Sequence, residues 1–222
     1  MWLLVCVPMV LICTILISCY LQKDRVYEDG KSGINIGNII AMKPSYILFL
    51  AVVFVLGIVA FGMQYNYFEE YIKASKLTFL IMLLSPIAYI DYKSNSIPNE
   101  LILTGFLARL VFYVIEMFSK NEAILEIFIS DMKGLLLGGG VFLIGALVMR
   151  NAIGMGDAKM YAIIGIFMGY YGTIISLMFS LFVCFIAAIG LLAMRKKTRK
   201  DTIPLAPFVL IGTFLAIFLG NY

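Results

Sequence analysis

Apolar runs of about the length that crosses a lipid bilayer recur along this whole chain. They occupy residues 1–20, 46–63, 77–90, 134–149 and 203–219; another ends near residue 118, and a longer one covers residues 158–194. A helix needs about 20 predominantly apolar residues to span the hydrocarbon core. With 63% hydrophobic and only 14% charged residues, the 222-residue chain lies far outside the composition of soluble proteins. We therefore expect an all-α polytopic membrane protein in contact with the bilayer and without a sizeable soluble domain.

The longest run, residues 158–194, is too long for a single span. Gly169-Tyr170-Tyr171-Gly172 offers a break in its middle, because glycine often interrupts a helix. We therefore expect a short sixth helix followed by a seventh. The chain then has about eight spans, and both termini lie on the same side of the membrane.

The distribution of lysine and arginine predicts which side that is. The loops 22–45, 91–100, 150–159 and 195–202 hold 12 of the 17 basic residues, loops 66–76 and 119–133 hold four, and Arg109 lies within a span. The loops richer in basic residues face the cytoplasm by the positive-inside rule. Both termini are therefore expected outside. The net charge of +4 bears on topology, and we expect no nucleic-acid partner.

Two aspartates stand at the cytoplasmic ends of these spans. Asp91 follows the run 77–90, and Asp157 closes the sequence Gly154-Met155-Gly156-Asp157. Acids in such apolar surroundings are costly, so they are candidates for function. If spans three to six cluster, the two carboxylates meet and share one proton. Such a dyad can activate a water molecule for attack on a peptide carbonyl.

The other residue types in the chain support few alternative catalytic chemistries. The chain has no histidine, and its four cysteines lie inside apolar runs without a C-x-x-C motif, so we expect no metal and no cofactor. Gly154 and Gly156 permit a close approach of the backbone to its neighbours. Pro98 suits the first turn of the next helix. The glycines at 138–140 are expected to allow close helix packing.

Simpler interpretations remain for each of these residues. Asp91 can be a solvated acid at a helix end, and Asp157 can cap the sixth helix. Lys159 is expected to be an interfacial cation or to oppose protonation of Asp157. Arg109 can pair with a substrate carboxylate or, as we favour, with Glu116, seven residues on and near the same helix face. The alternative function is a proton- or cation-coupled transporter, although neither acid lies at mid-span, where a transporter site is expected.

Three elements of the sequence resemble the type IV prepilin peptidases, which are membrane-embedded GxGD aspartic proteases. They are Asp91 with Ile97-Pro98-Asn99, Gly154-Met155-Gly156-Asp157-Ala158-Lys159 with Ala162, and Ile203-Pro204-Leu205-Ala206-Pro207-Phe208. The likeness covers roughly residues 77–212.

The resemblance implies that Asp91 and Asp157 are the catalytic pair, supported by Gly154, Gly156, Lys159, Ile97, Pro98 and Asn99. It implies a prepilin-like precursor as substrate, cut at the cytoplasmic face of the inner membrane after a short basic leader. Residues 77–222 would form the catalytic membrane core, and residues 1–76 the N-terminal spans and a short cytosolic loop. Larger members carry a cysteine-containing segment linked to N-methylation. The loop 22–45 has no cysteine, so we expect a short form without methyltransferase activity.

Overall fold

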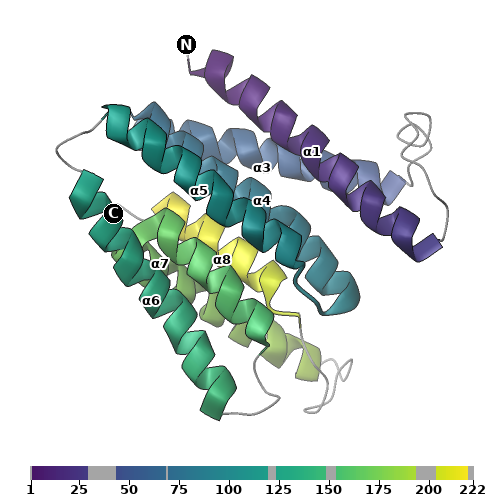
Figure 1. Ribbon diagram of the computed structural model, residues 1–222. Coiled ribbons are helices and arrows are strands. Elements are labelled where there is room, and N and C mark those ends of the chain that lie inside the picture. Colours follow the sequence, from purple (N-terminus) through teal and green to yellow (C-terminus); the bar gives the residue numbers. More distant parts are fainter. Residues whose placement is uncertain are drawn as a thin grey trace. The chain divides into compact units, whose positions relative to one another are not determined.

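The computed structural model describes residues 2–29, 44–68, 70–119, 124–148, 154–193 and 204–219, and these ranges contain helices and no strand. Six helices have the length and composition of membrane spans, and a shorter apolar helix follows them. The all-α architecture is thus confirmed for these ranges. The helices are α1 (Leu3–Asp29), α3 (Pro44–Phe68), α4 (Tyr71–Ser94), α5 (Asn99–Ser119), α6 (Ile124–Val148), α7 (Met155–Ala193) and α8 (Ala206–Leu219) (Figure 1).

The chain forms two compact units, Met1–Met82 and Leu83–Tyr222. In the first unit, α1 and α3 run antiparallel. The ring of Trp2 stacks on Phe61 with centroids 6.2 Å apart, and near the other end the Tyr46 hydroxyl donates a hydrogen bond of 3.2 Å to the Ser18 carbonyl. The expected division of roles between residues 1–76 and 77–222 stays a prediction.

In the second unit, glycines bring α6 and the first half of α7 into backbone contact. Gly134 faces Gly165, and a Cβ at either position would collide with the other's backbone. A Cβ at Gly138 would lie 2.5 Å from the Tyr161 carbonyl oxygen. The expected role of the glycine-rich segment in close packing is confirmed at Gly138, whereas a Cβ at Gly140 would meet nothing within 4 Å.

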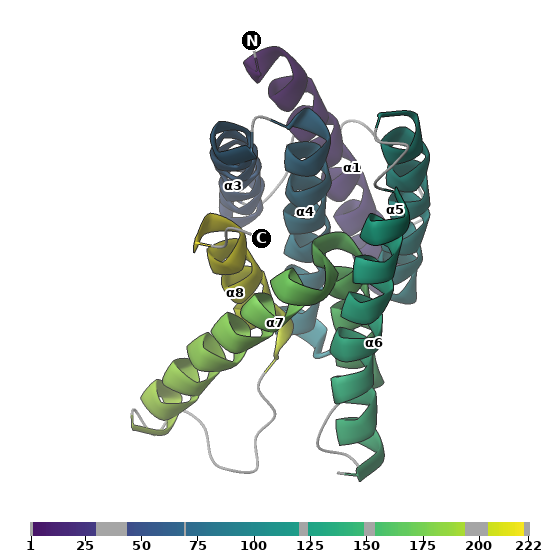
Figure 2. The same cartoon turned by 90° about the vertical axis from the view of Figure 1, so that its left-hand side faces the viewer.

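A sharp kink divides α7 where the sequence predicts a break. Gly169 has φ 68° and ψ −171°, in the region where a side chain is strained and glycine is favoured. The Tyr170 N–H freed by the kink donates to the Ser130 hydroxyl of α6 at 3.3 Å, and the Thr173 hydroxyl donates to the Gly169 carbonyl at 2.5 Å. Figure 2 shows the change of direction and α8 lying beside the second half of α7.

Small and hydroxyl side chains join α8 to the second half of α7. Gly212 lies directly against the backbone of Ser180, and the hydroxyls of Ser176 and Thr213 are hydrogen-bonded at 2.8 Å. All four residues are buried. These contacts fix where the N-terminal end of α8 lies within this unit.

Several helices extend beyond the expected spans. α1 continues to Asp29 rather than ending near residue 20, and α4 begins at Tyr71 and continues through Asp91 to Ser94. α6 begins at Ile124, so residues 124–133 are helical and not part of a loop. Helical hydrogen bonding does not stop where hydropathy falls, because polar side chains can continue a helix past the apolar core. Part of the loop 22–45, residues 150–153 and the basic run 195–200 lie outside the described residues, so the topology stays a prediction.

Candidate active site

Asp91 lies in the last turn of α4 and is only 6% exposed. Its backbone carbonyl accepts a hydrogen bond of 2.8 Å from Asn95, which has φ 48° and ends the helix in the left-handed conformation. The expectation that Asp91 itself terminates the span is therefore wrong by one turn. As a result, its side chain is held by regular helical backbone and is not part of the turn that follows.

The carboxylate of Asp91 is bound by the N-terminus of α8. Its Oδ2 accepts a buried hydrogen bond of 2.9 Å from the Ala206 N–H. The first N–H groups of a helix have no partner within the helix, and the helix dipole makes this end attractive to anions. Ala206 belongs to the motif of residues 203–208, and the sequence alone predicts no role for it. Pro204 and Pro207 signal a helix start there.

Asp157 lies in the first turn of α7, two residues after its first residue, Met155. Its N–H donates to the Gly154 carbonyl at 3.1 Å, and its carboxylate lies beside Gly154. Gly154 therefore occupies the cap position, and Asp157 reaches back to it as the acid of a capping box does. A Cβ at Gly154 would lie 3.3 Å from the Asp157 Oδ2, so the glycine leaves room for the carboxylate.

The two carboxylates lie near each other. The charge of Asp91 acts directly on the carboxyl group of Asp157. Since they come from α4 and α7, 66 positions apart, only the folding of the second unit brings them together. Two acids in this arrangement disfavour simultaneous ionisation and favour a state with one proton between them.

Two contacts tie the turn after Asp91 to the segment around Asp157. Gly156 faces Ile97, and a Cβ on the glycine would lie 3.1 Å from the Ile97 Cβ. The Lys159 ammonium donates a hydrogen bond of 2.8 Å to the Asn99 side-chain oxygen. Pro98 directly precedes α5, and its carbonyl accepts a bond of 3.4 Å from Ile102. Ile97 and Asn99 therefore lie against the first residues of α7, and a supporting role for them stays a prediction.

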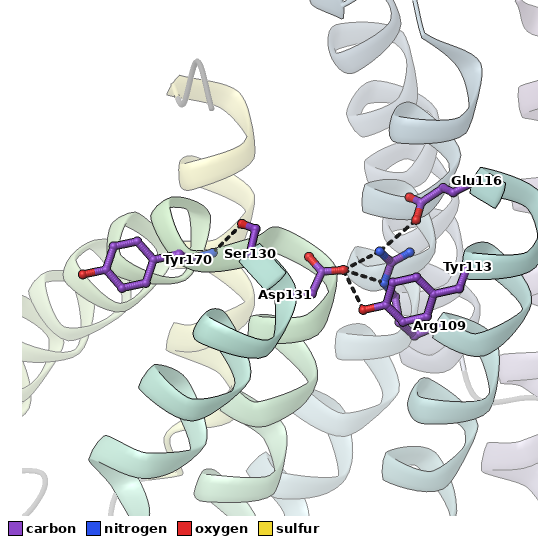
Figure 3. A network of polar contacts seen from close by, with 6 residues as sticks. All are labelled: Arg109, Tyr113, Glu116, Ser130, Asp131 and Tyr170. Carbon is purple, nitrogen blue, oxygen red and sulfur yellow. Dashed lines mark hydrogen bonds and ion pairs between the residues drawn. The ribbon is translucent and has the colours of Figure 1, made fainter. Parts of the chain in front are cut away.

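A second polar cluster lies between α5 and α6 (Figure 3). Arg109, which is 1% exposed, pairs with Glu116 at 2.9 Å, as the sequence analysis favours. It also pairs with Asp131, whose Oδ2 accepts a bond of 2.8 Å from the Tyr113 hydroxyl. The pairing with Asp131 was missed because residues 119–133 were expected to form a loop. With these partners, Arg109 is a structural cation joining two helices. Within the described ranges, no three His, Cys, Asp or Glu side chains gather as a metal site would require.

Comparison with known proteins places this site in a family. Residues 77–192 match the type IV leader peptidase family, and this range contains both Asp91 and Asp157. The chain belongs to the type IV leader peptidase family. The match ends before α8, so the segment that binds Asp91 lies beyond it.

Individual proteins similar to the chain carry the name of a leader peptidase. The chain is 27% identical over 144 residues to the prepilin leader peptidase/N-methyltransferase of Aeromonas hydrophila. The aligned region covers 64% of this chain and 48% of that protein. The protein of the same name from Aeromonas salmonicida strain A449 is 26% identical, and the aligned region covers the same fractions of the two chains. The chain spans about half the length of these relatives. No solved structure matches the chain.

Proposed function

We propose that this protein is a membrane-embedded aspartic endopeptidase whose catalytic pair is Asp91 and Asp157. The observation that carries the proposal is that two acids from separate helices lie close enough for one to feel the charge of the other. Family membership supplies the reaction class, since the matched range includes both acids. One carboxylate removes a proton from water while the protonated partner stabilises the carbonyl oxygen of the scissile bond.

The proposed substrates are type IV prepilin-like precursors, cut next to a short basic leader at the cytoplasmic face of the inner membrane. The names of the Aeromonas relatives support this substrate class. The chain would cross the membrane eight times, with the two halves of α7 and α8 as the last three spans and both termini outside. The concentration of basic residues in the loops that share a side with the two acids supports this orientation. Absence of methyltransferase activity stays a prediction.

Cleavage of a leader peptide by the purified protein tests the proposal. The substrate is a prepilin segment with a basic leader ending in glycine, and the protein is in detergent. Asp91→Asn and Asp157→Asn should each lower the cleavage rate by at least about 1,000-fold, because neither amide can complete the proton transfers. Glu100→Gln is the matched control: it makes the same chemical change on an exposed acid in the first turn of α5 and should cleave normally.

Thermal unfolding of each variant establishes that the protein is folded. Cleavage retained in a folded Asp91→Asn or Asp157→Asn variant would refute the dyad. Proton or cation flux into proteoliposomes that needs the same two acids, without peptide cleavage, would show that the protein is a transporter instead.

A further inference from the structure

We propose that the N-terminus of α8 positions Asp91 and holds it in its ionised form, so that Asp91 activates the water and Asp157 carries the proton. This inference rests on the proposed function and assigns separate roles to the two acids. Its starting point is the hydrogen bond of 2.9 Å from the Ala206 N–H to the Asp91 Oδ2, a contact between positions 115 residues apart.

Few N–H donors are available at this end of α8. Pro204 and Pro207 have no N–H group. The N–H of Phe208 donates to the Leu205 carbonyl at 3.0 Å, which closes the first turn. Of the two N–H groups between the prolines, those of Leu205 and Ala206, the Ala206 N–H donates to the Asp91 carboxylate. The first turn of α8 therefore directs one of its few free donors at this acid.

Burial by itself disfavours the ionised form of Asp91, and it also strengthens the hydrogen bond that the carboxylate accepts from Ala206. Asp91 is 6% exposed and Ala206 is 1% exposed, so water has little access to the hydrogen bond between them. Hydrogen bonds to an ionised carboxylate are about twice as strong as neutral ones, and they favour its charged form. The donor is also rigidly placed, because Gly212 and Thr213 of α8 are packed against the second half of α7.

Asp157 is in a different environment. Its own N–H donates to the Gly154 carbonyl, and its carboxyl group feels the charge of Asp91. Because two adjacent acids cannot both ionise at low cost, the negative charge resides on the acid that accepts the buried Ala206 N–H. Asp91 is then the base and Asp157 the acid.

The reaction follows from these roles. Ionised Asp91 takes a proton from water as the water oxygen bonds to the peptide carbonyl carbon, and Asp157 gives its proton to the carbonyl oxygen. The resulting diol collapses as Asp91 returns its proton to the departing nitrogen and the carbon–nitrogen bond breaks. Asp157 regains a proton from the diol hydroxyl. The products are a carboxylic acid and an amine, and both aspartates return to their starting states.

Two changes at residue 206 remove the critical N–H. Replacing Ala206 by lactic acid exchanges the N–H for an ester oxygen and preserves shape, and Ala206→Pro removes the same donor. Proline is tolerated at the first position of a helix. Ala206→Gly keeps the N–H, so it reports the effect of changing the side chain alone. Loss of a hydrogen bond to a charged group should lower kcat on the order of 10- to 100-fold, while KM stays within about threefold because substrate contacts are unchanged.

Cleavage rates are expressed per amount of folded protein. Thermal unfolding measures how much of each variant is folded. If wild-type cleavage requires both aspartates but the folded ester variant keeps the wild-type kcat, this inference fails and the proposed function stands. If the wild-type protein does not cleave, or cleaves without either aspartate, the proposed function itself fails.

Infrared difference spectra at neutral pH test the assignment without relying on cleavage. The spectrum of the wild-type protein minus that of Asp157→Asn should contain the band of a protonated carboxyl group. The spectrum of the wild-type protein minus that of Asp91→Asn should contain the bands of an ionised carboxylate. The reverse pattern would overturn the assignment.

Discussion

Adding one methyl group at Gly156 should disturb the proposed catalytic pair without touching either acid. The Cβ of Gly156→Ala would lie 3.1 Å from the Ile97 Cβ and 3.3 Å from its Cγ1 and Cδ1. Carbon atoms pack best at about 3.5–4.0 Å, so the two segments must separate by roughly 0.5 Å. Asp157 is the next residue in α7 and moves with the backbone. Such overpacking costs about 1–3 kcal/mol, and a misplaced catalytic group can lose on the order of 100-fold in rate.

We therefore expect Gly156→Ala to lower kcat by about 10- to 100-fold in the leader-peptide assay. Ile97→Ala in the same protein should restore part of the rate, since it removes two of the three atoms that the new methyl group meets. Gly140→Ala is the matched control, because nothing lies within 4 Å of its Cβ. A wild-type rate in folded Gly156→Ala, or no recovery in the double variant, would refute the steric coupling of the two segments.

Three further predictions concern stability and topology. Arg109→Met leaves two buried carboxylates without their cation, so the free energy of unfolding in mixed micelles should fall by about 3–5 kcal/mol; an unchanged value would contradict the ion-pair role. Gly165→Ala places a methyl group where the backbone of Gly134 lies, so it should lower both the unfolding temperature and the cleavage rate. A variant as stable as the wild-type protein would show that α6 and α7 are not in close contact. A periplasmic reporter fused after residue 200 should be inactive, and activity would overturn the proposed orientation.

Local features of the sequence predict much of the fold. Apolar runs predict the helices, because a backbone in lipid must satisfy its own hydrogen bonds. The break in α7 is predictable because its kink requires a φ of 68° at Gly169, which glycine adopts readily. The pairing of Arg109 with Glu116 is predictable because residues seven apart lie near the same face of a helix. The helix ends were less predictable, as the extension of α4 past Asp91 shows.

The sequence by itself indicates that Asp91 and Asp157 are unusual and that they lie on one side of the membrane. Only the tertiary structure brings their carboxylates together and directs the Ala206 N–H at Asp91. It also decides that Asp131 is a partner of Arg109. The physical reason is that periodicity and backbone preference are properties of neighbouring residues, whereas these contacts depend on how separate helices pack. Pro204 and Pro207 mark a helix start. Nothing in the neighbouring sequence indicates that this helix start binds an aspartate more than 100 residues away.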